Sequence, residues 1–198
     1  MIKAPLFALS LAVLLPGAVP VQDADVMEDA QAAFARVAAI VQPGEHHALL
    51  ERFVGTWKTT TKFNMGAWTA GEPGTAVVDW LMPGRWLRTE AQGQLMGQPF
   101  QSFSIMGYDN MKRSYVVCVV GSADTAMLTS EGDATPDGKA LITYGTLDEY
   151  LTGEHDKMVK YVWRFVADDK LVFEVHDLNL GETDTKVVET VYTRSSSS

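Results

Sequence analysis

Hydrophobic and polar positions along this chain follow one period before residue 55 and another after it. Between residues 28 and 41, apolar residues recur every three or four positions, which places them on one face of a helix. Pro43 and Gly44 end that run, and a second, shorter helix is predicted for residues 45–53. Beyond Gly55, stretches rich in Val, Thr and aromatic residues alternate with short groups of Gly, Pro, Asn and Asp, which is typical of β-strands joined by turns.

Ten strands are expected in this second part of the chain. The connections between them are too short for parallel crossovers, so consecutive strands must pair antiparallel. A meander with little helix to cover its faces removes its exposed edges best by closing on itself. The sequence therefore predicts an all-β fold, a closed antiparallel meander barrel of about ten strands with an N-terminal helical cap. A two-sheet sandwich is the alternative, which the sequential hairpins disfavour. The strands are predicted at residues 55–64, 75–82, 85–95, 100–108, 113–121, 126–133, 139–148, 156–166, 170–178 and 185–194.

Aromatic residues alternate with polar ones in several of these strands, which predicts the face that points into the barrel. Tyr161 and Trp163 share a face in one strand, and Trp57 holds the equivalent face of the first strand. By the same alternation Phe103 and Ile105 are expected to point inward, opposite two serines. These aromatic side chains form a core if the barrel is filled and ligand contacts if it is hollow.

Two pairs of charged residues have an orientation that the pattern leaves open. Arg88 and Glu90 share one face of their strand, so they are either a buried polar pair that contacts a ligand or ordinary surface charges. Glu174 and His176 share a face as well; as an inward pair they could orient a ligand or exchange a proton with it, and as an outward pair they belong to the surface.

The first residues resemble a secretory signal. Lys3 precedes an uncharged apolar run from residue 4 to 15, which is shorter than the ~20 residues of a membrane span. This segment predicts export to the periplasm or secretion, with no membrane span in the mature protein; an uncleaved anchor or an apolar N-terminal helix is the alternative. The expected organisation is a signal peptide at 1–24, helices at 25–54, a β-barrel domain at 55–194 and a flexible tail at 195–198.

Composition excludes several classes of function. The 198 residues contain 25 acids and 16 Lys plus Arg, a formal net charge of −9, which argues against nucleic acid as a partner. Cys118 is the only cysteine, so an internal disulfide and a multi-cysteine metal site are both excluded. The four histidines lack metal-binding spacing, and no nucleophile motif is present. We therefore expect no metal, assign no catalytic residue and identify no cofactor.

The two ends of the predicted barrel carry a shared signature. Gly55 and Trp57 open the first strand just after a short helix, and Arg194 ends the last strand. This arrangement resembles the lipocalin and fatty-acid-binding superfamily. The resemblance implies that Arg194 packs over the Trp57 indole as a cation–π pair and ties the first strand to the last. Gly55, Trp57 and Arg194 are therefore assigned structural roles.

A longer set of motifs is similar to the family catalogued as domain of unknown function 1579. The resemblance implies a calycin-like barrel and an exported bacterial context, and it implies no activity. Where the family carries Trp and Asp in the fifth strand, this chain has Val119 and Gly121, which points to a different ligand or to none. The motifs are Pro43-Gly-Glu-His46, Leu49-Leu-Glu-Arg52, Gly55-x-Trp57, Gly84-Arg-Trp-Leu87, Met96-Gly-Gln-Pro-Phe100, Gly107-Tyr-Asp-Asn110, Ser130-Glu-Gly132 and Glu189-Thr-Val-Tyr-Thr-Arg194.

Three functions follow from these observations and stay open. The first is a barrel that binds a small apolar or amphipathic molecule, without enzymatic activity. The second is a haem-binding barrel with redox or isomerase activity, which needs His155 or His176 as an axial ligand. The third is a packed structural or interaction barrel, a homodimer for example, that docks a partner through the helix at 28–41. The candidate ligand-binding residues are Trp57, Arg88, Glu90, Phe103, Tyr161, Trp163 and His176.

Overall fold

The computed structural model describes residues 24–95, 97–150, 152–178 and 185–195. The predicted signal peptide and the tail from residue 196 therefore lie outside the described residues. The chain forms two units, residues 1–40 and 41–198. In the first unit, helix α1 (Ala24–Val41) contains the helix predicted for residues 28–41. No helix in the described part of the chain is long and apolar enough to cross a membrane.

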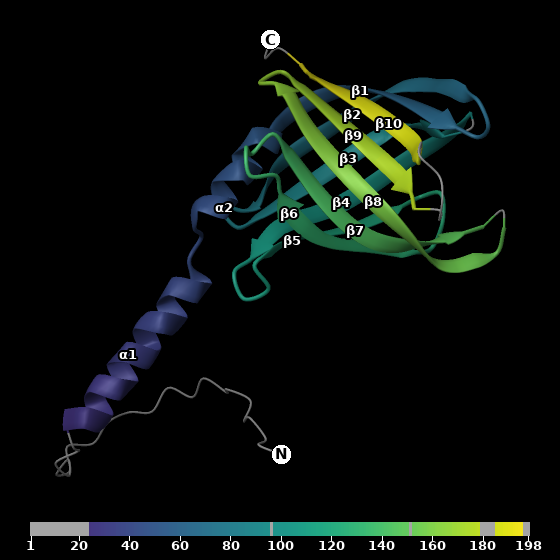
Figure 1. The fold of residues 1–198 in the computed structure, drawn as a ribbon. Helices are drawn as coiled ribbons and strands as arrows, with labels where there is room; N and C mark the ends of the chain where they lie inside the picture. The colour runs from purple at the N-terminus through teal and green to yellow at the C-terminus, as the bar shows by residue number, and fades with distance from the viewer. Residues whose placement is uncertain (1–23, 96, 151, 179–184, 196–198) are drawn as a thin grey trace. The chain divides into compact units, whose positions relative to one another are not determined.

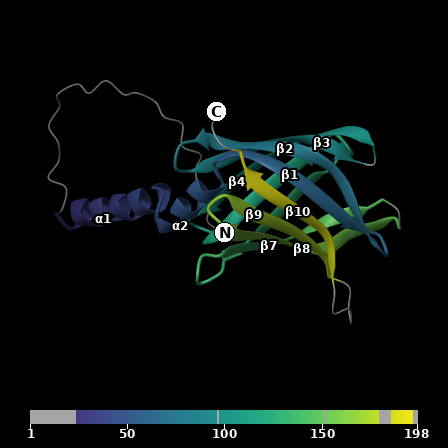
Figure 2. The same ribbon diagram turned by 90° about the horizontal axis from the view of Figure 1, so that it is seen from above.

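The second unit is a closed barrel of ten antiparallel strands (Figure 1). Each strand pairs with its neighbour in sequence, and the last strand pairs with the first, so the predicted meander barrel is confirmed and the sandwich is excluded. The view in Figure 2 shows the strands surrounding a common interior. The strands are β1 (Gly55–Asn64), β2 (Trp68–Met82), β3 (Trp86–Leu95), β4 (Gln98–Asp109), β5 (Ser114–Gly121), β6 (Met127–Ala134), β7 (Ala140–Glu149), β8 (Glu154–Ala167), β9 (Lys170–Asp177) and β10 (Lys186–Arg194).

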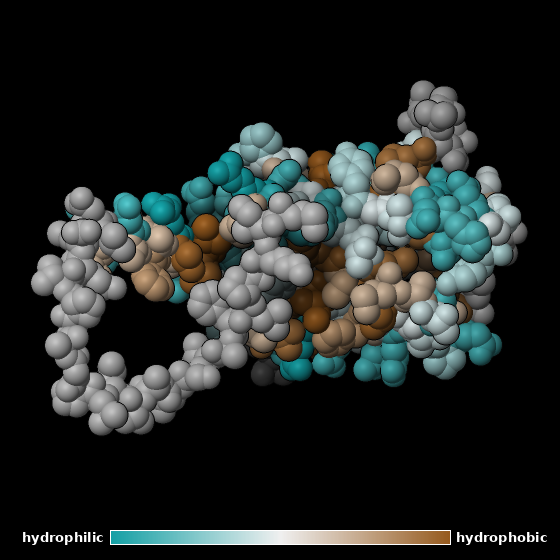
Figure 3. Space-filling view, turned by 90° about the horizontal axis from the view of Figure 1, so that it is seen from below, coloured by the Kyte–Doolittle hydropathy of each residue, from teal (hydrophilic) through white to brown (hydrophobic). Residues whose placement is uncertain are grey.

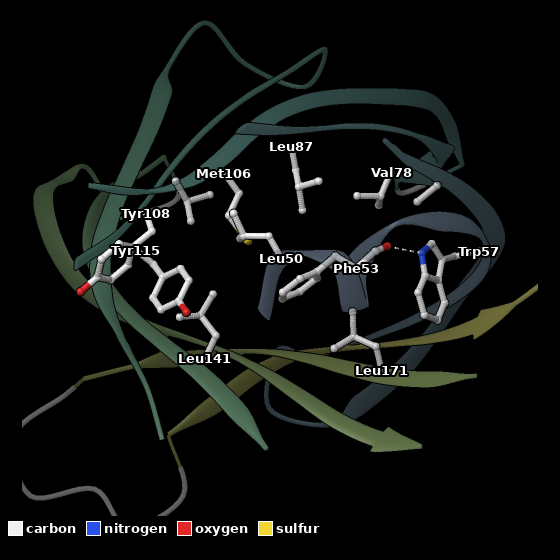
Figure 4. Close-up of a cluster of buried hydrophobic side chains, with 12 residues drawn as sticks. Leu50, Phe53, Trp57, Val78, Leu87, Met106, Tyr108, Tyr115, Leu141 and Leu171 are labelled. Atoms are coloured by element: carbon white, nitrogen blue, oxygen red, sulfur yellow. Dashed lines mark hydrogen bonds between the residues drawn. The ribbon is translucent and has the colours of Figure 1, made fainter. Parts of the chain in front are cut away.

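A short helical segment caps one end of the barrel. It consists of α2 (Glu45–Ala48) and the 3₁₀ helix η1 (Leu49–Phe53). Leu50 and Phe53 are 0% and 4% exposed and pack among the buried side chains drawn in Figure 4. The Trp57 indole nitrogen donates a hydrogen bond to the Phe53 carbonyl oxygen at 2.9 Å. The segment predicted as a helical cap therefore closes one end of the barrel, and this end contains most of the hydrophobic core.

Aromatic contacts hold the cap on strands β4 and β5. The Tyr115 hydroxyl donates to the His46 carbonyl oxygen at 2.7 Å, and the His46 ring stacks on Tyr108 with 4.4 Å between centroids. Burial raises the pKa of Tyr115 to about 12. His47 is buried beside Tyr108, and its Nδ1 accepts the Gly44 backbone N–H at 3.0 Å. Burial also lowers the pKa of His47, which favours the neutral imidazole in the folded cap.

Arg194 joins the first strand, the last strand and the cap. Trp57 and Arg194 are paired across β1 and β10, and the guanidinium carbon lies 4.1 Å from the centre of the Trp57 ring, so the expected cation–π pair is confirmed. The same guanidinium donates to the Val54 carbonyl, to the Arg52 carbonyl at 3.1 Å and to the Asp168 carbonyl at 3.1 Å.

Gly55 leaves the space that Arg194 occupies. Its φ is +144°, a conformation that side-chain-bearing residues rarely adopt, and an added Cβ would lie 2.2 Å from Arg194 Nη1. A glycine is therefore required here for two separate reasons, backbone conformation and the close approach of the guanidinium.

We expect the closure to show in a double-mutant cycle of Gly55→Ala and Arg194→Ala. Each substitution should lower the free energy of unfolding by about 2 kcal/mol, the first by steric conflict and backbone strain and the second by lost hydrogen bonds and ring contact. Their combination should cost clearly less than the sum, because the steric conflict disappears with the arginine. Urea denaturation measures the three values.

Gly153→Ala, at φ +75° with no heavy atom within 4 Å of the new Cβ, is the control and should be additive with Arg194→Ala. Full additivity of the Gly55 pair would contradict the assigned contact.

Candidate ligand-binding cavity

The barrel is hollow at the end opposite the cap. A cavity of about 650 Å³ opens there, and we call it the mouth cavity. Its lining includes Glu72 of β2 and Glu149 of β7, two strands on opposite sides of the barrel, so the cavity lies across the lumen. Phe63 and Val188, which are paired across β1 and β10, contribute apolar surface to it.

A smaller cavity of about 160 Å³, the inner chamber, lies between the mouth region and the capped end. One wall is aromatic: Trp163 and Phe173, with ring centroids 4.9 Å apart, and Tyr192. The other wall, from β3 and β4, presents short side chains such as Thr89 and Ser104. The inner chamber therefore has aromatic rings on one side and, on the other, a wall in which hydroxyl groups alternate with apolar side chains such as Leu87 and Met106.

Tyr192 shows that this surface faces the interior. Its side chain is only half-buried by accessible area, yet burial raises its pKa to about 12. The two observations agree if the accessible area belongs to the inner chamber and not to the outer surface, and Tyr192 does line that chamber. Half-buried residues on the inner face are thus a sign of empty volume inside the barrel.

Three polar groups lie on the inner face of β8 and β9. Lys157 Nζ contacts Asp177 Oδ2 at 2.6 Å, with side chains 13% and 16% exposed, and this hydrogen bond raises the pKa of Lys157. Asp177 lines the mouth cavity, and its Oδ1 is buried without a hydrogen-bond partner among the described residues. The Tyr161 hydroxyl is likewise buried and unpartnered, while its ring stacks on Phe173 at 6.1 Å.

Three of the predicted ligand-binding residues lie inside the barrel. Trp57 and Trp163 line the inner chamber. Tyr161 is next to Trp163, with 6.3 Å between ring centroids, and is 8% exposed. The structure thus brings together the aromatic residues of β1 and β8 that the alternation predicts to face inward.

Arg88, Glu90 and Phe103 lie on the outer face, so the inward orientation expected for Phe103 is wrong. Leu87 and Met106 are paired across β3 and β4 and are 1% and 8% exposed, so both point into the barrel. Because side chains alternate between the two faces of a strand, every second residue counted from Leu87 or Met106 also points inward. Glu90 and Phe103, a pair between these positions, therefore point outward.

Arg88 is a surface residue that forms a cross-strand ion pair with Asp79. Its Nε lies 2.6 Å from Asp79 Oδ1 and its Nη2 lies 3.0 Å from Oδ2. The hydrogen bond from Arg88 lowers the pKa of Asp79. Of the two orientations left open for Arg88 and Glu90, the surface one is present.

His176 and Glu174 also face outward, in a cluster of charged side chains on β8, β9 and β10. Arg164 Nε and Lys186 Nζ each lie 3.1 Å from a Glu174 carboxylate oxygen, and His176 Nε2 lies 3.5 Å away. Burial raises the pKa of Glu174, but hydrogen bonds from Lys186 and Arg164 outweigh this and leave it below its usual value. Burial lowers the pKa of His176. The pair is part of an ion network that joins strands.

The residues do not fit a haem. None of the four histidines lines the mouth cavity or the inner chamber. His176 is on the outer face, and His155 lies beside Asp148 on an exposed hairpin, 3.3 Å from its Oδ1. Within the described ranges, no group of three or more His, Cys, Asp or Glu is placed to hold a metal ion. The cavity residues that the sequence did not indicate include Asp177, Phe173 and Tyr192, and Lys157, which contacts Asp177, was not indicated either.

Comparisons with known proteins agree with the fold and leave the ligand open. The sequence profile of the family described as "Protein of unknown function (DUF1579)" matches residues 42–194. No curated protein matches the chain in sequence. Among solved structures, the crystal structure of Rv2717c from M. tuberculosis is similar, with a TM-score of 0.55, 11% sequence identity, and coverage of 78% of this chain and 99% of that one. At this identity the similarity concerns the fold alone.

Two alanines paired across β2 and β3 test whether the inner chamber is empty. Ala91 lines the chamber, whereas its partner Ala76 is 0% exposed in the packed core. We expect Ala91→Leu to raise the melting temperature by about 2–4 °C, because the added atoms fill open volume and gain about 1 kcal/mol. Ala76→Leu should lower the free energy of unfolding by about 1–3 kcal/mol through overpacking. Thermal and urea unfolding measure both, and equal destabilisation by the two substitutions would show that the chamber is filled.

Proposed function

The chain belongs to the DUF1579 family, whose function is unknown, and we propose that this member binds a small apolar or amphipathic molecule in the lumen of its barrel. The observation that carries the proposal is the mouth cavity. Its volume of about 650 Å³ falls within the ~300–1,000 Å³ typical of small-molecule pockets. No catalytic group is assigned, and the proposed activity is binding.

The distribution of packing along the barrel supports this proposal. The side chains of Leu50, Phe53 and Trp57 fill the capped end, so a ligand cannot enter the lumen there. The opposite end keeps an apolar cavity lined by residues such as Phe63 and Val188. Each 100 Å² of apolar ligand surface buried there is worth about 2.5 kcal/mol, which favours an apolar guest.

The two other candidate functions have less support. A haem-binding barrel lacks a histidine at either cavity, as described above. A fully packed structural barrel does not account for two cavities in the lumen.

We also propose that the protein is exported through its N-terminal segment. The support is the sequence of residues 1–24, in which one basic residue precedes a short apolar run. Fractionation of the native host, followed by mass determination of the N-terminus, tests this. A processed chain outside the cytoplasm is expected, and an intact N-terminus on cytoplasmic protein would contradict export.

Binding can be measured with N-phenyl-1-naphthylamine, an uncharged fluorescent probe of apolar sites. We expect saturable uptake of one probe per chain with a Kd of about 1–10 μM, equivalent to about −7 to −8 kcal/mol. Val188→Trp, which places a large side chain in the mouth cavity, should weaken uptake about tenfold or more. Val191→Trp on the outer face of the same strand is the matched control and should leave uptake unchanged. Absence of saturable uptake, or equal loss in both variants, would contradict binding in the lumen.

A further inference from the structure

The mouth cavity carries charge of one sign. Its charged lining residues are Glu72, Glu149 and Asp177, from β2, β7 and β9, and the described lining contains no Lys, Arg or His. We propose that the mouth cavity selects amphiphiles whose polar end is a protonated primary amine over those that end in a carboxylate. The inference rests on the proposed binding function and specifies the chemistry of its ligand.

Acidic groups outnumber basic groups around the one lysine on this part of the inner face. Lys157 Nζ contacts Asp177 Oδ2 at 2.6 Å, so the positive charge of Lys157 is paired with the Asp177 carboxylate. Glu149 of β7 is paired with Glu154 of β8, the strand that carries Lys157, and both carboxylates also raise the pKa of Lys157. The cavity lining therefore carries three carboxylates, those of Glu72, Glu149 and Asp177, beside the single ammonium of Lys157. A second positive charge brought by a ligand is attracted by this surplus, and a negative charge is repelled.

Lysines elsewhere in this half of the barrel do not cancel the surplus. Lys62 and Lys186 lie on the outer face, where both pair with Glu189; Lys62 Nζ is 2.8 Å from Glu189 Oε1. Lys186 also contacts Glu174 at 3.1 Å. These charges are separated from the lumen by the strands themselves, and they are already paired.

A second observation points to a hydrogen-bond donor on the ligand. Asp177 Oδ1 is buried, and no described residue donates to it. A buried carboxylate oxygen without a donor is costly, and an ammonium N–H satisfies it while adding charge attraction. A ligand carboxylate has no proton to donate. Asp177 is paired with Val159 of the adjacent strand β8, and Tyr161 lies two residues further along that strand. The buried Tyr161 hydroxyl is therefore a further hydrogen-bond acceptor on the same inner face.

Dodecylamine, dodecan-1-ol and dodecanoate test the inference, because they share one alkyl chain and differ at the polar end. Each displaces N-phenyl-1-naphthylamine from the full chain at pH 7, at low salt and below micelle-forming concentrations. We expect the amine to bind about tenfold or more tightly than the carboxylate, with the alcohol between them. The preference should shrink on adding salt, since the mouth cavity is open to solvent.

Charge-neutralising variants assign the preference to the mouth. Glu72→Gln combined with Glu149→Gln should reduce the ratio of amine to carboxylate affinity by about threefold or more. Glu90→Gln on the outer face is the control and should leave the ratio unchanged. Equal or tighter binding of dodecanoate, or a ratio unaffected by the double substitution, would overturn this inference while lumen binding stands. Failure of the probe and all three ligands to bind would instead overturn the proposed function.

Discussion

The pairing of β1 with β10 is the constraint on which the rest of this structure depends. Ten strands in a meander leave two unpaired edges unless the last strand returns to the first, and only closure creates a lumen. Arg194 fixes that closure, because it stacks on Trp57 of the opening strand. It also donates to the carbonyl groups of Arg52 and Val54 at the end of the cap. The Arg194 side chain therefore joins the two end strands of the barrel and binds the cap to them. Gly55 has no side chain, which leaves the space that the guanidinium occupies.

Packing changes along the barrel axis in a way that separates stability from binding. Near the cap, large side chains such as Trp57 and Leu50 fill the interior and belong to the main cluster of buried apolar residues. Further along, short side chains such as Ser104 face aromatic rings across open volume. Unfilled volume lowers stability relative to a packed core, so a hollow half is tolerated only because the capped half is well packed.

Alternation and short turns were sufficient to predict the barrel and its cap, because they leave few other topologies, whereas the closing pair of Trp57 and Arg194 followed from the resemblance to the lipocalin superfamily. The sequence pattern misplaced Phe103, since Phe103 and Ile105 point out whereas Ser102 and Ser104 line the inner chamber, as expected for a wall beside empty volume. It also began the second strand seven residues late, because Gly71, Pro73 and Gly74 are typical of a turn, whereas Trp68–Met82 forms one strand with a register shift. The mouth cavity could not be predicted, because its lining depends on strand register across the barrel.

Charge is arranged differently on the two sides of the barrel wall. On the outer face several acids are paired with bases: Asp79 with Arg88 and Glu189 with Lys62 across strands, and Glu189 also with Lys186 of its own strand. Such pairs add little stability when exposed, but they leave no local surplus. At the mouth, the carboxylates of Glu72, Glu149 and Asp177 outnumber the single ammonium of Lys157 beside them. A surplus of carboxylates around an apolar cavity is a feature that a ligand can recognise.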